Sequence, residues 1–243
     1  MTTAPVLHTD VLNRLGREIV CGVHPPGSVL TLAGLAVDFR VSRTVVRETV
    51  RVLESLGLVE SRRRVGVTVL APRGWSVLDP RVIRWRLSGP GRDAQLHALT
   101  ELRLAVEPTA ARLAAHKAAP GTGARLLELA AVIRRLGETG GGAGQEYLQA
   151  DIAFHTLLLE ASGNDMLMAL EGAITEVLSG RTTLGLTPAW PVAASLHNHE
   201  ETARAVADGD EDRAESYARA VVMEVWHELR DVDFTPPVDG AQP

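Results

Sequence analysis

The stretch VSRTVVRETVRVLESLGLVE, residues 41–60, constrains the fold of this chain more than any other segment. Three of its apolar residues recur at helical spacing and would form one buried stripe: Val46, Val50 and Leu53. Ser42 is a suitable N-cap, and Gly57 can end a helix in the left-handed conformation. The pattern therefore predicts a helix that begins after Ser42 and ends before Gly57.

A second stripe on the same helix is basic, because Arg43, Arg47 and Arg51 recur every fourth residue. Like charges at this spacing cost a helix about 0.2–0.5 kcal/mol per pair. A polyanion would neutralise them, since arginine pairs with phosphate and binds guanine O6 and N7 in a bidentate manner. The alternative is an ordinary solvated basic face.

The surrounding segments give this helix a recognisable context. Residues 11–20 and 31–39 have helical patterns, and the short β-type runs LVES and VTVL follow on either side of a basic tip. Three helices followed by a two-stranded hairpin is the order of a winged helix-turn-helix, whose recognition helix enters the major groove. The predicted DNA contacts are Arg43, Thr44, Arg47, Arg51, Arg64 and Gly66.

The charge distribution agrees with one DNA-facing module. Residues 1–73 hold ten arginines and six acids, a net charge of +4, whereas the remainder is acidic at −9. No apolar run reaches the roughly 18 residues of a membrane span. The N-terminus lacks a secretory pattern, and Cys21 is the single cysteine, so no internal disulfide can form. We therefore expect a cytoplasmic protein with no membrane partner.

The rest of the chain is predicted to be helical. We expect a mainly α protein with a winged helix-turn-helix domain at 6–72, a connector at 73–92 that packs against its surroundings, and an all-α bundle of about six helices at 93–232. One of these helices is predicted over 165–183. The GGGAG segment at 140–144 is interpreted as a flexible joint.

A cluster of ligand-type residues lies in the helical half. Asp151 and His155 are four residues apart and project from one helix face, and His199 could approach them from another helix. These three residues are candidate ligands of a divalent metal. The alternative is an ion pair that lines a polar pocket. Arg103 is a candidate for binding a carboxylate, or for a salt bridge with Glu107 at i+4.

The N-terminal motifs resemble the DNA-binding domain of GntR-family bacterial transcription regulators. The matching segments are PPGSVL, LA at 35–36, VSRTVVRETVRVLESLGLV and the Gly66–Val69 wing. The resemblance places DNA contacts on Arg43, Thr44 and Arg47, with Gly66 in the wing. Arg40 departs from the pattern, because the family usually has glycine there, so this turn is either strained or differently shaped. Ala33 replaces an arginine that contacts DNA in some members.

The helical half is similar to the ligand-binding FCD domain of the FadR-like branch, through ELRLAVEPTAARLAA, DIAFHTLLLEASGN and HEETARAVADGD. The resemblance implies a homodimer and a small carboxylate effector held near Arg103, Asp151, His155 and His199. It also implies a zinc- or nickel-like ion on the last three, although Val221 stands at the usual fourth ligand. The segment WSVLDPRVIRW is similar to members that respond to sugar acids.

The expected function is therefore a DNA-binding transcription regulator, most simply a repressor, that binds double-stranded operator DNA and answers to a small carboxylate. It is not expected to be an enzyme. The alternative is a metal-dependent enzyme that uses Asp151, His155 and His199 and carries an added basic module. No nucleophile elbow or phosphate loop in the sequence supports such turnover.

Overall fold

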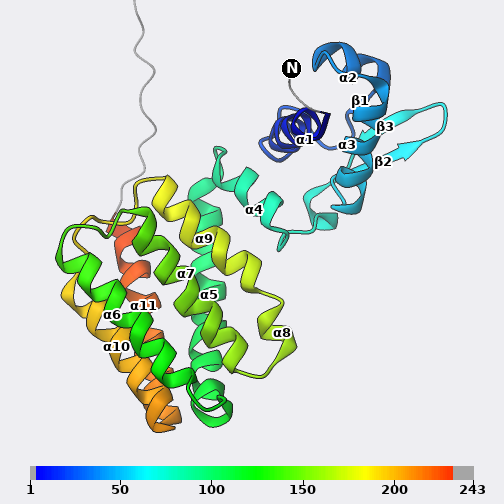
Figure 1. Cartoon of the computed structure of the whole chain (residues 1–243). Helices are drawn as coiled ribbons and strands as arrows, with labels where there is room; N and C mark the ends of the chain where they lie inside the picture. The colour runs from blue at the N-terminus through cyan, green and yellow to red at the C-terminus, as the bar shows by residue number, and fades with distance from the viewer. Residues whose placement is uncertain (1–3, 232–243) are drawn as a thin grey trace, which may run out of the picture. The chain divides into compact units, whose positions relative to one another are not determined.

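The computed structural model describes residues 4–231, with side chains from residue 9 to residue 229. The chain forms two compact units, one ending at Gln95 and the other beginning at Leu96 (Figure 1). Residue 232, the predicted end of the helical domain, lies outside the described residues. In the described part, no helix is long and apolar enough to cross a membrane.

The N-terminal unit contains the predicted three helices and hairpin. Its helices are α1 (Ala4–Val20), α2 (Leu32–Asp38) and α3 (Arg43–Ser55), and its hairpin strands are β2 (Val59–Arg62) and β3 (Gly66–Val69). The structure adds a strand to the predicted two-stranded wing: β1 (Val29–Leu30) pairs antiparallel with β3, giving the order β1-β3-β2. Two residues are too few to show strand alternation in a sequence.

The core of this unit lies between α1, α3 and the sheet. Leu15 and Ile19 of α1 meet Leu53 of α3 and Val67 of β3 in one buried cluster. Gly57 follows α3 in the left-handed conformation, as predicted, and an added Cβ would lie 2.1 Å from the carbonyl oxygen of Gly74. The apolar stripe of α3 thus holds the helix against the core and leaves its basic face outside.

The segment predicted as a connector, residues 73–92, packs largely within the N-terminal unit. It contains part of a short 3₁₀ turn, η1 (Pro72–Gly74), and the helix α4 (Pro80–Leu87), whose N-cap Asp79 accepts a hydrogen bond from the Arg81 backbone. Trp85 of α4 is buried, and its Nε1 donates to Asn13 Oδ1 of α1 at 3.1 Å.

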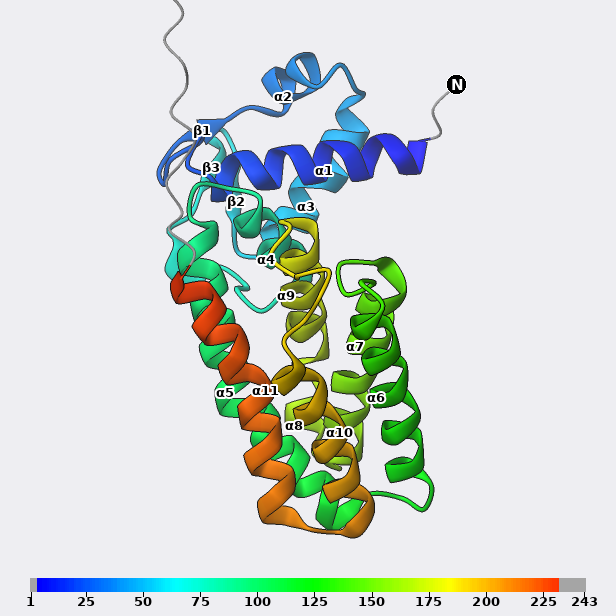
Figure 2. The same cartoon turned by 90° about the vertical axis from the view of Figure 1, so that its left-hand side faces the viewer.

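The C-terminal unit is a bundle of seven helices among the described residues: α5 (Arg92–Lys117), α6 (Thr122–Glu138), α7 (Gln145–Ala161), α8 (Asp165–Met168), α9 (Glu171–Thr183), α10 (Ala193–Asp208) and α11 (Glu211–Asp231). Helices α11, α10, α6, α7 and α9 are successive neighbours (Figure 2). Val106 and Ala110 of α5 pack against α7 and α9. The bundle surrounds the residues predicted to bind metal and effector.

Two predictions for this unit were wrong. The helix expected over 165–183 is interrupted at residues 169–170, so α8 is a separate single turn. The GGGAG segment packs against the α9–α10 loop: an added Cβ at Gly142 would lie 2.4 Å from Pro188 O, and Gly142 N donates to Ala189 O at 2.9 Å. These glycines allow close approach of two segments, a long-range requirement that composition alone could not reveal.

Candidate nucleic-acid interface and buried pocket

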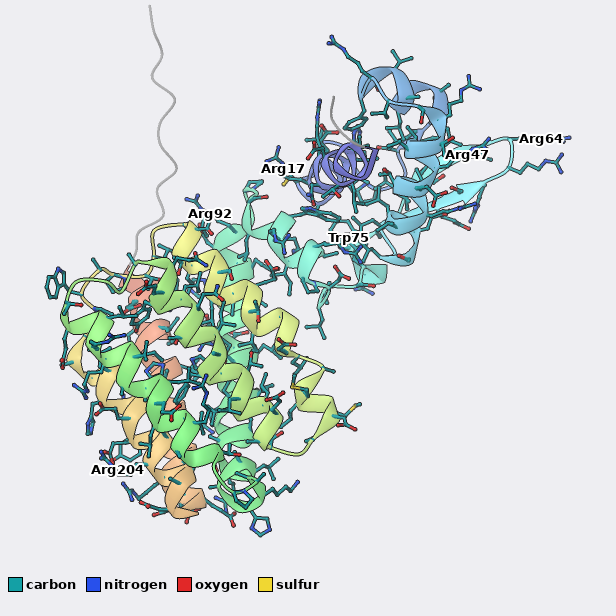
Figure 3. The ribbon with its side chains drawn as sticks, viewed as in Figure 1. Arg17, Arg47, Arg64, Trp75, Arg92 and Arg204 are labelled. Carbon is teal, nitrogen blue, oxygen red and sulfur yellow. The ribbon has the colours of Figure 1, made fainter. Side chains whose placement is uncertain are left out.

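Helix α3 presents the predicted basic face. The Ser42 hydroxyl caps the helix by accepting from Val45 N at 3.3 Å. Val46, Val50 and Leu53 are buried as predicted, whereas the side chains of four predicted DNA contacts are exposed: Arg43, Thr44, Arg47 and Arg51. Figure 3 shows Arg47 on α3 and Arg64 extending from the tip of the wing. The N-terminal half of α3 is therefore open to a partner.

Only part of the arginine stripe is neutralised within the protein. Arg51 pairs with Glu48 at 2.8 Å, and both side chains are largely exposed, so water screens the pair. Arg43 and Arg47 form no ion pair with any residue that the structure describes. The two arginines nearest the N-terminus of α3, where a recognition helix meets base edges, remain available.

The wing tip is basic and tightly turned. Arg64 is exposed and adopts a left-handed backbone with φ of 69°, while Arg62 pairs with Glu60 at 3.0 Å. Gly66 has φ of 123°, and a Cβ there would lie 2.7 Å from Leu30 O. The glycine is therefore required by the neighbouring strand β1, whether or not it also approaches DNA.

Arg40 lies in the turn between α2 and α3 with a left-handed φ of 54°. The turn keeps the backbone form that glycine would favour, since Arg40 N donates to Val37 O and Val41 N donates to Ala36 O, both at 3.1 Å. Of the two possibilities that the sequence left open, the strained turn is the one observed. A non-glycine residue in this region costs about 1–2 kcal/mol.

The C-terminal unit contains a cavity of about 40 Å³ that is lined by all three candidate metal ligands. Asp151 and His155 come from α7, and His199 comes from α10. One ligand atom of each lies within 4.8 Å of the others. Asp151 Oδ1 is 3.4 Å from His155 Nε2 and 3.3 Å from His199 Nε2. The predicted convergence of these three residues is thus present.

His199 has the hydrogen bonding of a metal ligand. Its Nδ1 lies 2.7 Å from the carbonyl oxygen of Ser195, to which it donates, so the lone pair falls on Nε2. This Nε2 atom is buried and has no hydrogen-bond partner in the described structure. A carbonyl that fixes the tautomer of a histidine is the usual arrangement behind a bound ion.

Arg103 and Glu107 of α5 form a buried pair behind this cluster. Arg103 Nε donates to Glu107 Oε1 at 2.5 Å, Arg103 NH2 is 3.3 Å from His155 Nε2, and Glu107 Oε2 is 2.9 Å from His155 Nδ1. Of the two alternatives for Arg103, the structure shows the salt bridge with Glu107, and the side chain also lines the cavity. Its NH1 has no hydrogen-bond partner among the described residues.

The charges in this cluster control one another. Burial raises the pKa of Glu107, but Arg103 and His155 outweigh it and lower that pKa to about 2. Burial likewise raises the pKa of Asp151, and the close approach of His155 and His199 brings that pKa well below its usual value. Burial lowers the pKa of His155, whereas Glu107 and Asp151 raise it to about 9. Glu107, Asp151 and His155 are therefore charged at neutral pH.

Sequence reasoning missed three further residues that line the cavity: Tyr147 of α7, Arg181 of α9 and Glu228 of α11. Arg181 is 7% exposed, and its NH2 donates to Glu228 Oε2 at 2.6 Å and to Leu186 O at 3.4 Å. Burial, strengthened by Asp151, raises the pKa of Tyr147. The available signal was the single arginine within the helical segment AITEVLSGRTT.

Other sequence candidates lie elsewhere. Val221 does line the cavity and contributes only an apolar wall there. His197 packs its ring against Tyr217 at 6.1 Å, and neither His197 nor His227 is among the described residues that line the cavity. In the described structure, the group of residues that could hold an ion therefore consists of Asp151, His155 and His199.

A winged helix with an exposed arginine stripe, joined to a helical unit with a charged internal cavity, defines a class of protein: ligand-responsive DNA-binding regulators. Comparison with known proteins gives the family. Residues 7–69 match the bacterial regulatory proteins of the gntR family, and residues 98–223 match the FCD domain. The chain belongs to the GntR family of bacterial transcription regulators and carries an FCD domain.

The relatives are regulators as well. The galactonate operon transcriptional repressor of Escherichia coli is 29% identical over 90% of this chain and 94% of its own length. The transcriptional regulator LutR of Bacillus subtilis is 29% identical over 79% of this chain and 86% of its own. These proteins and the family are transcription regulators, so the enzyme alternative has no support.

Solved structures share the fold. One is that of Lar, which controls the expression of the Listeria monocytogenes agr system; it has a TM-score of 0.62 and 18% identity, and the match covers 96% of this chain and 99% of Lar. Another is a GntR protein of Streptococcus agalactiae, with a TM-score of 0.50 and 24% identity. The match covers 93% of this chain and 100% of the Streptococcus protein.

Proposed function

We propose that this regulator is a cytoplasmic repressor that binds operator DNA as a homodimer and is released by a small carboxylate, such as a sugar acid. The observation that carries the proposal is Arg103, whose buried NH1 has no hydrogen-bond partner in the described structure and whose side chain lines a charged cavity. A guanidinium binds a carboxylate through paired hydrogen bonds. The galactonate repressor among the relatives supports both the repression and the sugar acid.

The DNA contacts proposed are Arg43, Thr44, Arg47 and Arg51 of α3 with Arg64 and Gly66 of the wing. A recognition helix of this length reads one half-site, and a homodimer would place two of them on a pseudo-palindromic operator. The effector would shift the dimer between geometries that match or miss the half-site spacing. This arrangement is that of the FadR-like branch, to which we assign the chain.

A divalent ion such as zinc or nickel is proposed on Asp151, His155 and His199. The residues present fit an ion, because His199 Nε2 is an orphaned buried nitrogen and its tautomer is fixed by Ser195 O. Glu107 Oε2 lies 2.9 Å from His155 Nδ1, and ion binding would displace the second ring proton that His155 carries at neutral pH. When bound, the ion would supply open coordination positions for a carboxylate oxygen.

The carboxylate proposal is tested by mobility shift on a DNA fragment that includes the promoter of the regulator's own gene. Gluconate, galactonate and lactate are titrated against the complex, and their stabilisation of the free protein is measured by thermal shift. We expect at least one acid to raise the melting temperature and release the DNA. Release that persists unchanged in Arg103→Lys, which removes the fork and keeps the charge, would contradict the assigned pocket.

Metal binding is tested separately by elemental analysis. Protein purified without chelator should retain close to one zinc or nickel ion per chain, and His155→Ala and His199→Ala should each lose most of it. His116→Ala is the control, since His116 is 66% exposed and pairs with Glu211 on the surface. Equal metal content in all three variants would argue against the site.

A further inference from the structure

The cavity contains a second charged group that the carboxylate-binding cluster does not use. Arg181 and Glu228 pair at 2.6 Å, and the Nε of Arg181 is buried with no hydrogen-bond partner in the described part of the chain. Glu228 uses Oε2 in this pair, and its side chain is 34% exposed. Glu224, Thr187 and Tyr147 also line the cavity. A donor, several acceptors and two hydroxyl groups therefore share the cavity with Arg103.

The charge on this second group is already balanced. Glu228 neutralises Arg181. Burial, together with the negative charge of Glu224, keeps the pKa of Glu228 above its usual value despite the opposing effect of Arg181. A second carboxylate on a ligand would therefore meet two acids and a guanidinium that is already paired. Hydroxyl groups face no such repulsion, since they can donate to Glu228 and accept from Arg181 Nε.

From this pairing we infer that Arg181 and Glu228 select effectors that carry one carboxylate and several hydroxyl groups, and reject dicarboxylates. The inference rests on the proposed function, because Arg103 must take the carboxylate. Arg181 and Glu228 then bind the hydroxylated remainder of the molecule. Sites that hydrogen-bond a ligand hydroxyl discriminate strongly against analogues without it, because the buried polar groups are left unpaired.

The test compares acids that share one carbon skeleton. Gluconate and galactonate each carry one carboxylate, glucarate and galactarate carry a second one in place of the terminal hydroxymethyl group, and hexanoate carries no hydroxyl. Affinities are measured by calorimetry on the full-length protein as purified. We expect the better aldonate to bind at least tenfold more tightly than its aldarate and at least a hundredfold more tightly than hexanoate.

The variant Glu228→Gln should reduce the aldonate-to-aldarate ratio at least tenfold, because it removes one repelling charge and leaves Arg181 free to pair with the second carboxylate. Glu215→Gln is the matched control: Glu215 also lies on α11, is 33% exposed and pairs with Arg219 at 3.2 Å, but does not line the cavity. It should leave the ratio at the wild-type value.

The outcomes separate the two proposals. Equal or tighter binding of the aldarate, equal binding of hexanoate, or the same ratio in Glu228→Gln and Glu215→Gln would overturn the selectivity inference and leave the carboxylate effector standing. Binding of none of these acids, with no release of operator DNA, would overturn the proposed effector class and the inference together.

Discussion

Arginines serve the two units of this protein in opposite ways. On α3, Arg43 and Arg47 are exposed and make no ion pair within the described structure, although their spacing is unfavourable for an isolated helix. In the bundle, Arg103 and Arg181 are almost fully buried, and each pairs with a glutamate at 2.5–2.6 Å. The same side chain is left unpaired in one unit and neutralised in the other.

The difference follows from solvation. Water stabilises an exposed guanidinium at little cost, so Arg43 and Arg47 can remain unpaired in the protein and available for the proposed DNA contacts. A buried guanidinium without a partner costs several kcal/mol, so the cavity must supply its own counter-charges before any ligand binds. Removing a pocket arginine should therefore affect folding, whereas truncating Arg47 of α3 to alanine should affect DNA binding alone.

The largest expected effect is on folding. Arg103→Ala would leave Glu107 buried without its main partner, and we expect the free energy of unfolding to fall by about 3–5 kcal/mol. Urea denaturation followed by circular dichroism measures it. Adding Glu107→Gln to the same chain should recover part of the loss. A decrease below about 1 kcal/mol for Arg103→Ala would break the distinction between the two kinds of arginine.

The next effect is on DNA alone. Arg47→Ala should weaken operator binding by about 1–3 kcal/mol and leave the melting temperature unchanged, because the side chain has no ion-pair partner in the described structure. Fluorescence anisotropy measures the affinity. Arg125→Ala, an exposed arginine of α6 that pairs only with Glu128 among the described residues, is the control and should bind normally. Wild-type affinity in Arg47→Ala would contradict the assigned interface.

A smaller effect is expected at the wing. Arg64→Ala should weaken binding to operator and unrelated DNA alike, and reduce the slope of log K against log salt by about 1, as for one phosphate contact. Anisotropy titrations at several salt concentrations measure the slope. A loss confined to the operator would instead assign Arg64 to base recognition.

The smallest effect concerns strain. Arg40→Gly should raise the free energy of unfolding by about 0.5–1 kcal/mol, since glycine adopts the left-handed φ of 54° without the side-chain clash. The thermal midpoint of the N-terminal unit reports it. Arg43→Gly, in the first turn of a regular helix, should have the opposite sign. If Arg40→Gly also weakened operator binding, Arg40 would join the interface.

Much of the DNA-binding unit could be predicted from the sequence because its determinants are local. Three of these determinants lie in α3 or directly beside it: the cap at Ser42, the apolar stripe from Val46 to Leu53 and the turn at Gly57. The pairing of Asp151 with His155 is local for the same reason, since both lie on one face of α7. The spacing of residues along a helix determines which side chains share a face.

The contacts between residues of different helices and loops were decided by the tertiary structure alone. Helix packing brought Glu107 to His155, Arg181 to Glu228, and the glycines at 140–144 against the α9–α10 loop. Each of these contacts joins different elements of the chain, and periodicity does not encode which apolar faces meet. The sequence by itself thus determined helix α3 and its exposed arginines, while the packed bundle determined the balance of charge inside the cavity, because burial makes every unpaired charge costly.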